Sequence, residues 1–222
     1  MERLLEPELM EDDAQAQAYA QADFEAPHSH FIRLFQQTFP HYPLSGYVLD
    51  LGCGPGDISI RFAHAFPRSI VHGVDGAEAM LRYGRTALER APDVRERMKL
   101  IHGLLPDVSL PRRRYEAVIS NSLLHHLPDP AVLWQTVRRY AAPGAPVFIM
   151  DLRRPRSRAE AQALTDTYVA GEPAILQRDF YNSLLAAFEP AEIETQLKAA
   201  NLDCLSVQVV SDRHVVIAGH LV

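Results

Sequence analysis

Short hydrophobic runs alternate with longer amphipathic stretches through the middle of the chain. Runs bounded by glycine, proline and polar residues are typical of strands buried on both faces, whereas the longer stretches repeat with a helical period. The expected strands are 47–51, 69–74, 98–102, 115–120 and 146–151. The expected helices between them are 56–65, 76–90 and 130–141. This alternation predicts an α/β fold with a mostly parallel, doubly wound sheet.

The two ends of the chain follow other patterns. Amphipathic helices are expected before the first strand, and after the last parallel strand come a helical insert, a further helix that begins at a proline, and two β-rich runs. In order, these elements are helices over 12–24 and 28–39, the insert 153–188, a helix over 190–200, and strands over 205–210 and 214–221. The turn residues Ser211 and Asp212 separate the last two runs, which predicts a closing antiparallel hairpin.

The composition describes a folded protein of one domain. The chain has 222 residues and a mass of 24.9 kDa, and 47% of its residues are hydrophobic, which suits a single core of good size. The formal net charge is −6 and the basic clusters are short, so no nucleic-acid partner is expected. Cys53 and Cys204 are too few for a disulfide framework and lack the spacing of a zinc site.

The amino terminus lacks the pattern of an export signal. It reads MERLLEPELMEDDAQ, which is acidic where a signal peptide is basic and then apolar. No run approaches the ~18 apolar residues of a membrane span. We therefore expect a cytoplasmic protein without a membrane partner.

The most specific pattern follows the first expected strand. Residues 48–57 read VLDLGCGPGD, with glycines at alternate positions leading into a helix. The second strand ends in Asp75 about 20 residues later, the spacing at which an acid meets a ribose in a nucleotide-binding βαβ unit. This pair predicts an adenosine-containing cofactor. The alternative is a tight strand-to-helix turn with Asp57 as an acid in the first turn of the helix.

The charges around this loop distinguish between cofactors. A dinucleotide fingerprint has the spacing G-x-G-x-x-G, and its backbone N–H groups face an anionic pyrophosphate. Here Asp57 stands where the third glycine would fall, and Asp50 precedes the loop. Two carboxylates repel a pyrophosphate at close range but suit the ammonium and sulfonium of S-adenosylmethionine.

Three segments give the chain its resemblance to the class I S-adenosylmethionine-dependent methyltransferases. They are VLDLGCGPGD, HGVDGAEAML and YEAVISNSLLHHLPDP, and the last is similar to the branch that includes the ubiquinone and menaquinone enzymes. The resemblance implies a Rossmann-like, seven-stranded sheet with a C-terminal antiparallel hairpin and amino-terminal lid helices. It also implies one domain over 1–222, divided into a helical lid (1–43), a cofactor-binding core (44–152), a helical insert (153–188), and a C-terminal helix and hairpin (189–222).

The same resemblance implies a set of cofactor contacts at the carboxyl ends of the strands, where ligands of open parallel sheets bind. Asp75 is expected to accept hydrogen bonds from the ribose hydroxyls, Asn121 to hold the methionine end, and Met80 to flank the adenine. Many relatives carry aspartate where this chain has Leu104, so adenine recognition must use backbone groups, apolar contacts or another side chain. The expected cofactor-binding residues are Tyr19, Asp50, Gly52, Cys53, Gly54, Gly56, Asp75, Gly76, Met80, Gly103, Leu104, Asn121 and Ser122.

Few side chains are candidates for catalysis. Consecutive residues diverge in direction, so only one of His125 and His126 is expected to face the crevice, and the resemblance favours His126. Tyr181 could reach an acceptor from the insert. For His126 and Tyr181 the alternative is a packing role. Tyr19 is expected to touch the methionine carboxylate from a mobile lid, and its alternative is packing in the core. The remaining histidines lack metal-like spacing, so no metal site is expected.

The resulting hypothesis is methyl transfer from S-adenosylmethionine to a small-molecule acceptor. The arginines at 153, 154, 156 and 158 would suit an anionic acceptor, although solvated loop arginines are the alternative. A non-catalytic S-adenosylmethionine-binding sensor or partner subunit is the second hypothesis. A nicotinamide-dependent oxidoreductase is the third, and Asp57 argues against it.

Overall fold

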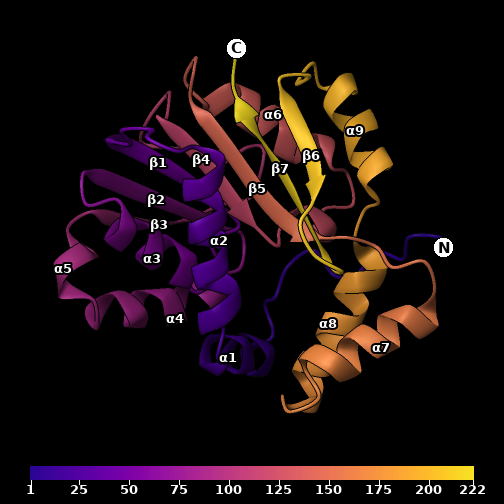
Figure 1. Ribbon diagram of the computed structural model, residues 1–222. Coiled ribbons are helices and arrows are strands. Elements are labelled where there is room, and N and C mark those ends of the chain that lie inside the picture. Colours follow the sequence, from indigo (N-terminus) through magenta and orange to yellow (C-terminus); the bar gives the residue numbers. More distant parts are fainter.

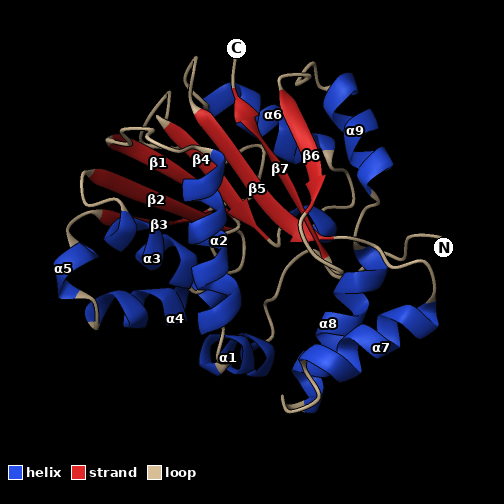
Figure 2. Ribbon diagram, viewed as in Figure 1, coloured by secondary structure: helices blue, strands red, loops and turns tan.

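The computed structural model describes residues 1–222 and contains one seven-stranded sheet in the order β3-β2-β1-β4-β5-β7-β6 (Figures 1 and 2). Strands β1 to β5 are parallel, and β7 is antiparallel to both β5 and β6. The expected mostly parallel sheet with a C-terminal hairpin is confirmed. The strands are β1 (Gly46–Leu51), β2 (Ser69–Asp75), β3 (Met98–His102), β4 (Ala117–Asn121), β5 (Pro146–Leu152), β6 (Leu205–Val209) and β7 (His214–His220).

Helices cover both faces of this sheet, with α2 in front of it and α6 behind it in Figure 1. The 3-10 turn η1 (Leu124–His126) follows β4 directly. The helices are α1 (Asp13–Gln21), α2 (Glu25–Thr38), α3 (Asp57–Ala65), α4 (Glu78–Glu89), α5 (Pro92–Arg95), α6 (Ala131–Tyr140), α7 (Arg158–Tyr168), α8 (Ala174–Ala186) and α9 (Pro190–Ala199).

Alternate residues of the central strands supply two separate cores. Val48 of β1 packs in a cluster with residues of α2 and α3, whereas Leu49 packs in a cluster with residues of α6 and α9, as the period of two in a strand requires. On the first face, the ring of Phe35 lies edge-on to Phe62 and Phe148, with centroids 4.9 and 5.6 Å away. The amino-terminal helix α2 is thereby fixed to the sheet.

Two boundaries differ from the expected ones for identifiable reasons. Helix α2 begins at Glu25 rather than at 28, because Pro27 lies in the first turn, where its missing N–H has no intrahelical partner to lose. Strand β4 begins at Ala117 rather than at 115, and Tyr115 makes only an isolated bridge to Ala141. The short elements α5 and η1 were not expected at all.

Helices α7 and α8 form a small unit beyond the carboxyl ends of β4 and β5, with its own apolar cluster (Figure 1). The residues before α1, which we call the amino-terminal arm (residues 1–12), run alongside α8. Arg3 donates to the carbonyls of Ala186 on α8 and of His125 and Leu127 around η1. The arm therefore bridges the insert and the end of β4.

Candidate active site

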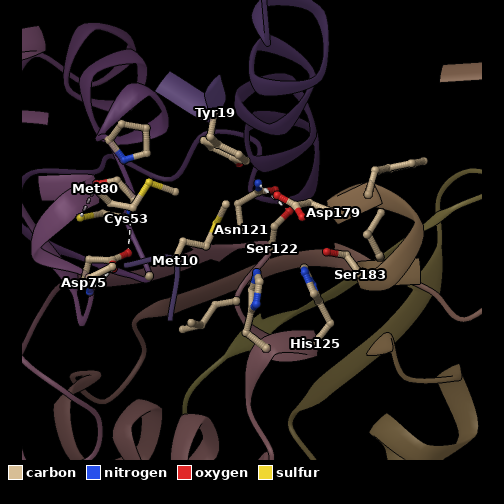
Figure 3. Close-up of a pocket in the computed structure, with 18 of the residues that line it drawn as sticks. Met10, Tyr19, Cys53, Asp75, Met80, Asn121, Ser122, His125, Asp179 and Ser183 are labelled. Carbon is tan, nitrogen blue, oxygen red and sulfur yellow. Dashed lines mark hydrogen bonds between the residues drawn. The ribbon is translucent and has the colours of Figure 1, made fainter. Parts of the chain in front are cut away.

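A cavity of about 750 Å³ opens at the carboxyl ends of the parallel strands. Figure 3 shows Cys53, Asp75 and Met80 at one end and His125, Asp179 and Ser183 at the other. The structure brings nearly all the expected site residues to its wall, and only Gly56 and Tyr181 do not line it. Those that do are Tyr19, Asp50, Gly52, Cys53, Gly54, Asp75, Gly76, Met80, Gly103, Leu104, Asn121, Ser122 and His126.

The glycine loop turns sharply between β1 and α3. Gly52, Gly54 and Gly56 have φ angles of +70°, +52° and +79°, a region that residues with a Cβ rarely adopt. A Cβ on Gly52 would lie 2.8 Å from the side chain of Leu123. Gly56 is the residue that precedes α3, so it shapes the turn without reaching the cavity.

Asp75, at the end of β2, is held by the loop and by its own strand end. Its Oδ2 accepts from the Gly54 N–H and its Oδ1 from the Ala77 N–H, both at 2.8 Å. Burial raises the pKa of Asp75 above its usual range, although both N–H groups oppose the shift. Each carboxylate oxygen keeps a further lone pair, so two hydroxyls of a ligand can bind where the loop and β2 meet.

The two acids beside the loop are less available to a ligand than the sequence suggests. The Ser59 hydroxyl donates to Asp50 at 2.5 Å, and burial raises the pKa of Asp50 to about 7. Asp57 lies 2.6 Å from both His28 Nδ1 and Arg61 Nε. Burial alone would raise the pKa of Asp57, but these two partners lower it. Because Arg61 offsets its charge, Asp57 repels a pyrophosphate less than we expected.

Apolar side chains line the loop end of the cavity. Met80 is buried, whereas Leu104 is 52% exposed. A Cβ on Gly76 would lie 2.7 Å from Leu104 and 2.8 Å from Leu9, so the absent side chain leaves space for both. Leu9 belongs to the amino-terminal arm, and the sequence had not indicated it as a site residue.

Both histidines of η1 line the cavity, which corrects the expectation that only one of them faces it. Their ring centroids are 4.3 Å apart. The reason is that each ring has its own partner: His125 Nδ1 donates to Asp151 Oδ1 at 2.5 Å, and His126 Nδ1 lies 3.4 Å from the carbonyl of Pro7 in the arm.

The charge states of the two rings differ. Burial would lower the pKa of His125, but the Asp151 carboxylate raises it. Burial lowers the pKa of His126 to about 3, and neighbouring His125 adds to this effect. His126 is therefore a neutral imidazole at physiological pH.

The two candidate tyrosines lie in different surroundings. Tyr19 of α1 points into the cavity, and its ring centroid is 4.7 Å from that of Phe24 (Figure 3). Burial raises the pKa of Tyr19 to about 12, so its hydroxyl remains a hydrogen-bond donor. Tyr181 packs against the apolar cluster of α7 and α8 instead. This placement corrects the expectation that Tyr181 reaches an acceptor in the cavity.

Sequence reasoning missed the groups that the arm and α8 bring to the far end. Gln15 of α1 donates to Asp179 of α8 at 2.8 Å, and Ser183 of α8 donates to Glu6 of the arm at 3.2 Å. Burial raises the pKa of Glu6 to about 7. No local pattern marks these residues, because only contacts between the arm, α1 and α8 bring them together.

The expected arginine cluster does not face the cavity. Arg154 is buried and pairs with Glu189 and Glu192, and its neighbours at 153, 156 and 158 do not line the cavity either. Two other cations, Arg178 and Arg213, lie on the cavity wall. Each is also within salt-bridge distance of the aspartate adjacent to it in sequence.

A family model described as a methyltransferase domain matches residues 48–144, the segment that contains the glycine loop, Asp75 and η1. The ubiquinone biosynthesis O-methyltransferase of Paracidovorax citrulli is 29% identical over 75% of this chain and 67% of its own length. Residues 48–144 therefore form a methyltransferase domain, and the comparisons support membership of the class I S-adenosylmethionine-dependent methyltransferases. The cofactor of this family is S-adenosylmethionine, as expected from the acids around the loop and from the resemblance.

Two further comparisons concern the length and the fold of this protein. An uncharacterized methyltransferase of Mycobacterium tuberculosis is 29% identical over 56% of this chain, and the match spans 59% of that relative's length. The crystal structure of an S-adenosylmethionine-dependent methyltransferase from Aquifex aeolicus covers 95% of this chain and 99% of its own, with a TM-score of 0.70. At 15% identity, this likeness shows the fold alone. None of the helices is long and apolar enough to cross a membrane.

Proposed function

We propose that this protein transfers the methyl group of S-adenosylmethionine to a small-molecule acceptor by in-line displacement. One observation carries the proposal: the glycine loop with Asp75 and the polar groups of η1, α8 and the arm line the same cavity of about 750 Å³. Pockets for small ligands range over roughly 300–1,000 Å³, so this one is large enough for a cofactor and a small acceptor together.

In this proposal the cofactor occupies the loop end. Asp75 accepts hydrogen bonds from the ribose hydroxyls, while Met80 and Leu104 contact the adenine. The methionine portion lies along Gly52–Gly54, near Asn121. Support comes from the buried Oδ1 of Asn121, which has no hydrogen-bond partner within the chain and can accept from an ammonium. Asp50 and the hydroxyl of Tyr19 complete the polar contacts to this end of the cofactor.

The acceptor then occupies the end near η1 and α8, where Phe180 and Leu176 supply apolar surface and Ser183 a hydroxyl. The neutral imidazole of His126 faces this region. Because Arg178 and Arg213 also line the cavity, an anionic acceptor suits the site better through these two than through the arginines at 153–158.

Methyl transfer requires little from the protein beyond alignment of the reacting atoms. The sulfonium leaves as a neutral thioether, so the main task is to hold acceptor, methyl and sulfur in line in a cavity from which water is excluded. The arm, α1 and α8 line the cavity, and in this proposal they exclude water from it when the ligands are bound. A base is needed only for an acceptor that must lose a proton.

The test is formation of S-adenosylhomocysteine from S-adenosylmethionine with a labelled methyl group in the presence of a metabolite extract. We expect wild-type protein to form it and to label an acceptor, and Asp75→Asn to do both at least about tenfold more slowly when the cofactor concentration is below its dissociation constant. Asp203→Asn, which changes an exposed acid outside the cavity, serves as the matched control. Binding of S-adenosylmethionine without any transfer would instead support the non-catalytic sensor.

A further inference from the structure

Glu6, His125 and His126 gather three potential metal-ligand atoms at the acceptor end of the cavity, and all three lie within 4.8 Å of one another. Glu6 Oε1 is 3.5 Å from His125 Nε2 and 3.3 Å from His126 Nδ1. His126 Nδ1 also lies 3.4 Å from the Pro7 carbonyl, so metal binding requires the tautomer in which Nδ1 carries no proton and this contact is given up. All three residues line the cavity. The cluster joins the amino-terminal arm to the turn after β4.

These separations fit the coordination of a small divalent cation. In a tetrahedral site with bonds of about 2.0–2.1 Å, neighbouring ligand atoms are about 3.3 Å apart. The two carboxylate–imidazole distances, 3.3 and 3.5 Å, are close to this edge length. Two imidazoles and one carboxylate form a ligand set typical of zinc and of other first-row transition metals.

Glu6 lies within salt-bridge distance of both imidazoles, but its Oε1 makes no hydrogen bond to either of them. Oε1 is buried and has no hydrogen-bond partner, although both imidazoles are near it. The side chain of Glu6 is only 8% exposed. An unpartnered buried carboxylate oxygen is costly, by about 1–3 kcal/mol or more, and a cation bound between it and the two rings would offset that cost.

A second carboxylate orients one of the ligands. Asp151 accepts from His125 Nδ1 at 2.5 Å, and its other oxygen accepts from the Leu124 N–H at 2.7 Å. This arrangement directs Nε2 of His125 toward Glu6. Metal-binding histidines commonly donate their other ring nitrogen to a carboxylate in this way, which fixes the ring and its tautomer.

We propose that Glu6, His125 and His126 bind one divalent transition-metal ion, with a fourth position open to the cavity. If the proposed methyl transfer is right, that position is where an acceptor oxygen would bind. A cation there would hold an acceptor hydroxyl and favour its deprotonated form. The metal site itself does not depend on the methyl transfer.

The test is titration of the metal-free protein with Co²⁺, followed by the visible absorption of the ion, with Zn²⁺ binding measured by calorimetry. We expect one ion per chain, with Zn²⁺ displacing Co²⁺. Glu6→Gln and His126→Ala should each weaken binding by at least about tenfold. Glu2→Gln, on the exposed part of the same arm, should leave it unchanged. Thermal unfolding without metal verifies that every variant is folded, and Glu6→Gln keeps the shape of the side chain.

Two results would overturn the proposal: no stoichiometric binding to the wild type, or equal binding to the wild type and to both ligand variants. S-adenosylhomocysteine binding, measured on the same preparations, separates this outcome from failure of the proposed function. We expect Glu6→Gln to lose the metal and keep the cofactor. A wild type that binds metal but no S-adenosylhomocysteine would contradict the proposed function and leave the metal site standing.

Discussion

Replacing Asp75 by asparagine removes one charge at the point where the glycine loop meets β2. The carboxylate accepts from two backbone N–H groups, those of Gly54 and Ala77, one on each oxygen. The amide of asparagine has a single acceptor oxygen, so its NH₂ group must face one of these two donors. One ribose hydroxyl would then face the NH₂ group, which is a donor, instead of a carboxylate oxygen. The other hydroxyl would face a neutral amide oxygen instead of a charged one.

The expected loss of affinity follows from the bonds involved. Hydrogen bonds to charged groups contribute about 1.5–3 kcal/mol each, and two ribose hydroxyls would bind the carboxylate. Since asparagine retains one acceptor, we expect a loss of about 2–4 kcal/mol. This corresponds to a dissociation constant about 30- to 1,000-fold weaker. The opposed N–H groups should also lower the free energy of unfolding by about 1–3 kcal/mol.

Calorimetric titration with S-adenosylhomocysteine measures the affinity, and circular dichroism during heating verifies that the variant is folded. Asp203→Asn provides the control for a change of net charge alone, and we expect it to bind as the wild type does. An Asp75→Asn protein that is folded and binds within about threefold of the wild type would refute the assignment of Asp75 to the ribose.

Three further predictions follow from the site. The pKa of Asp50 is about 7, above the roughly 3.9 of an unfolded chain, so its contribution to stability is complete below about pH 4 and is lost as the pH rises through 7. Asp50→Asn should therefore flatten the pH dependence of chemical denaturation between these values. Gly52→Ala should lower the free energy of unfolding by at least about 1–2 kcal/mol, because it adds a strained φ angle and a contact with Leu123; unchanged urea denaturation would contradict this. Arg3→Ala removes the bonds that hold the arm to α8 and η1, so limited proteolysis should cut the arm faster than in wild type, and bound S-adenosylmethionine should slow cutting within 8–40. Equal cutting rates with and without the cofactor would remove the lid hypothesis.

The sequence predicted the sheet and the cofactor end of the site well, for a physical reason. Fully buried parallel strands appear as apolar runs, and their carboxyl ends meet at one edge of the sheet. The predicted strand 146–151 therefore coincides to within one residue with β5, in which every residue is buried. For the same reason the loop after β1 and Asp75 after β2, separated in sequence, were expected together and are joined by a hydrogen bond.

The other end of the cavity depends on contacts between residues distant in sequence. Glu6 reaches His125 because Arg3 attaches the arm to the carbonyls around η1 and α8, and no periodicity in the first residues indicates this path. The expectation that His125 and His126 diverge failed for the same reason, since Asp151 and the arm hold the two rings separately. The spacing of the histidines, from which no metal site was expected, is likewise a local criterion, and it does not consider Glu6, which the proposed metal site takes from the arm.

The charges around the glycine loop are balanced differently from what the sequence suggested. Asp57 was expected to repel a pyrophosphate, but Arg61 and His28 bind its carboxylate. The preference for a cationic cofactor then depends on Asp75, on the buried Asp50 and on the free Oδ1 of Asn121. None of these three groups is positively charged, so none of them could form an ion pair with the pyrophosphate of a dinucleotide.

The most direct test of the cofactor assignment is calorimetric titration of the wild-type protein with sinefungin, a cationic analogue of S-adenosylmethionine, and with NADH under the same conditions. The buried carboxyl groups of Asp50 and Asp75 and the unpartnered Oδ1 of Asn121 predict binding of one sinefungin per chain and no measurable heat with NADH. Tight binding of NADH together with no response to sinefungin would contradict the account.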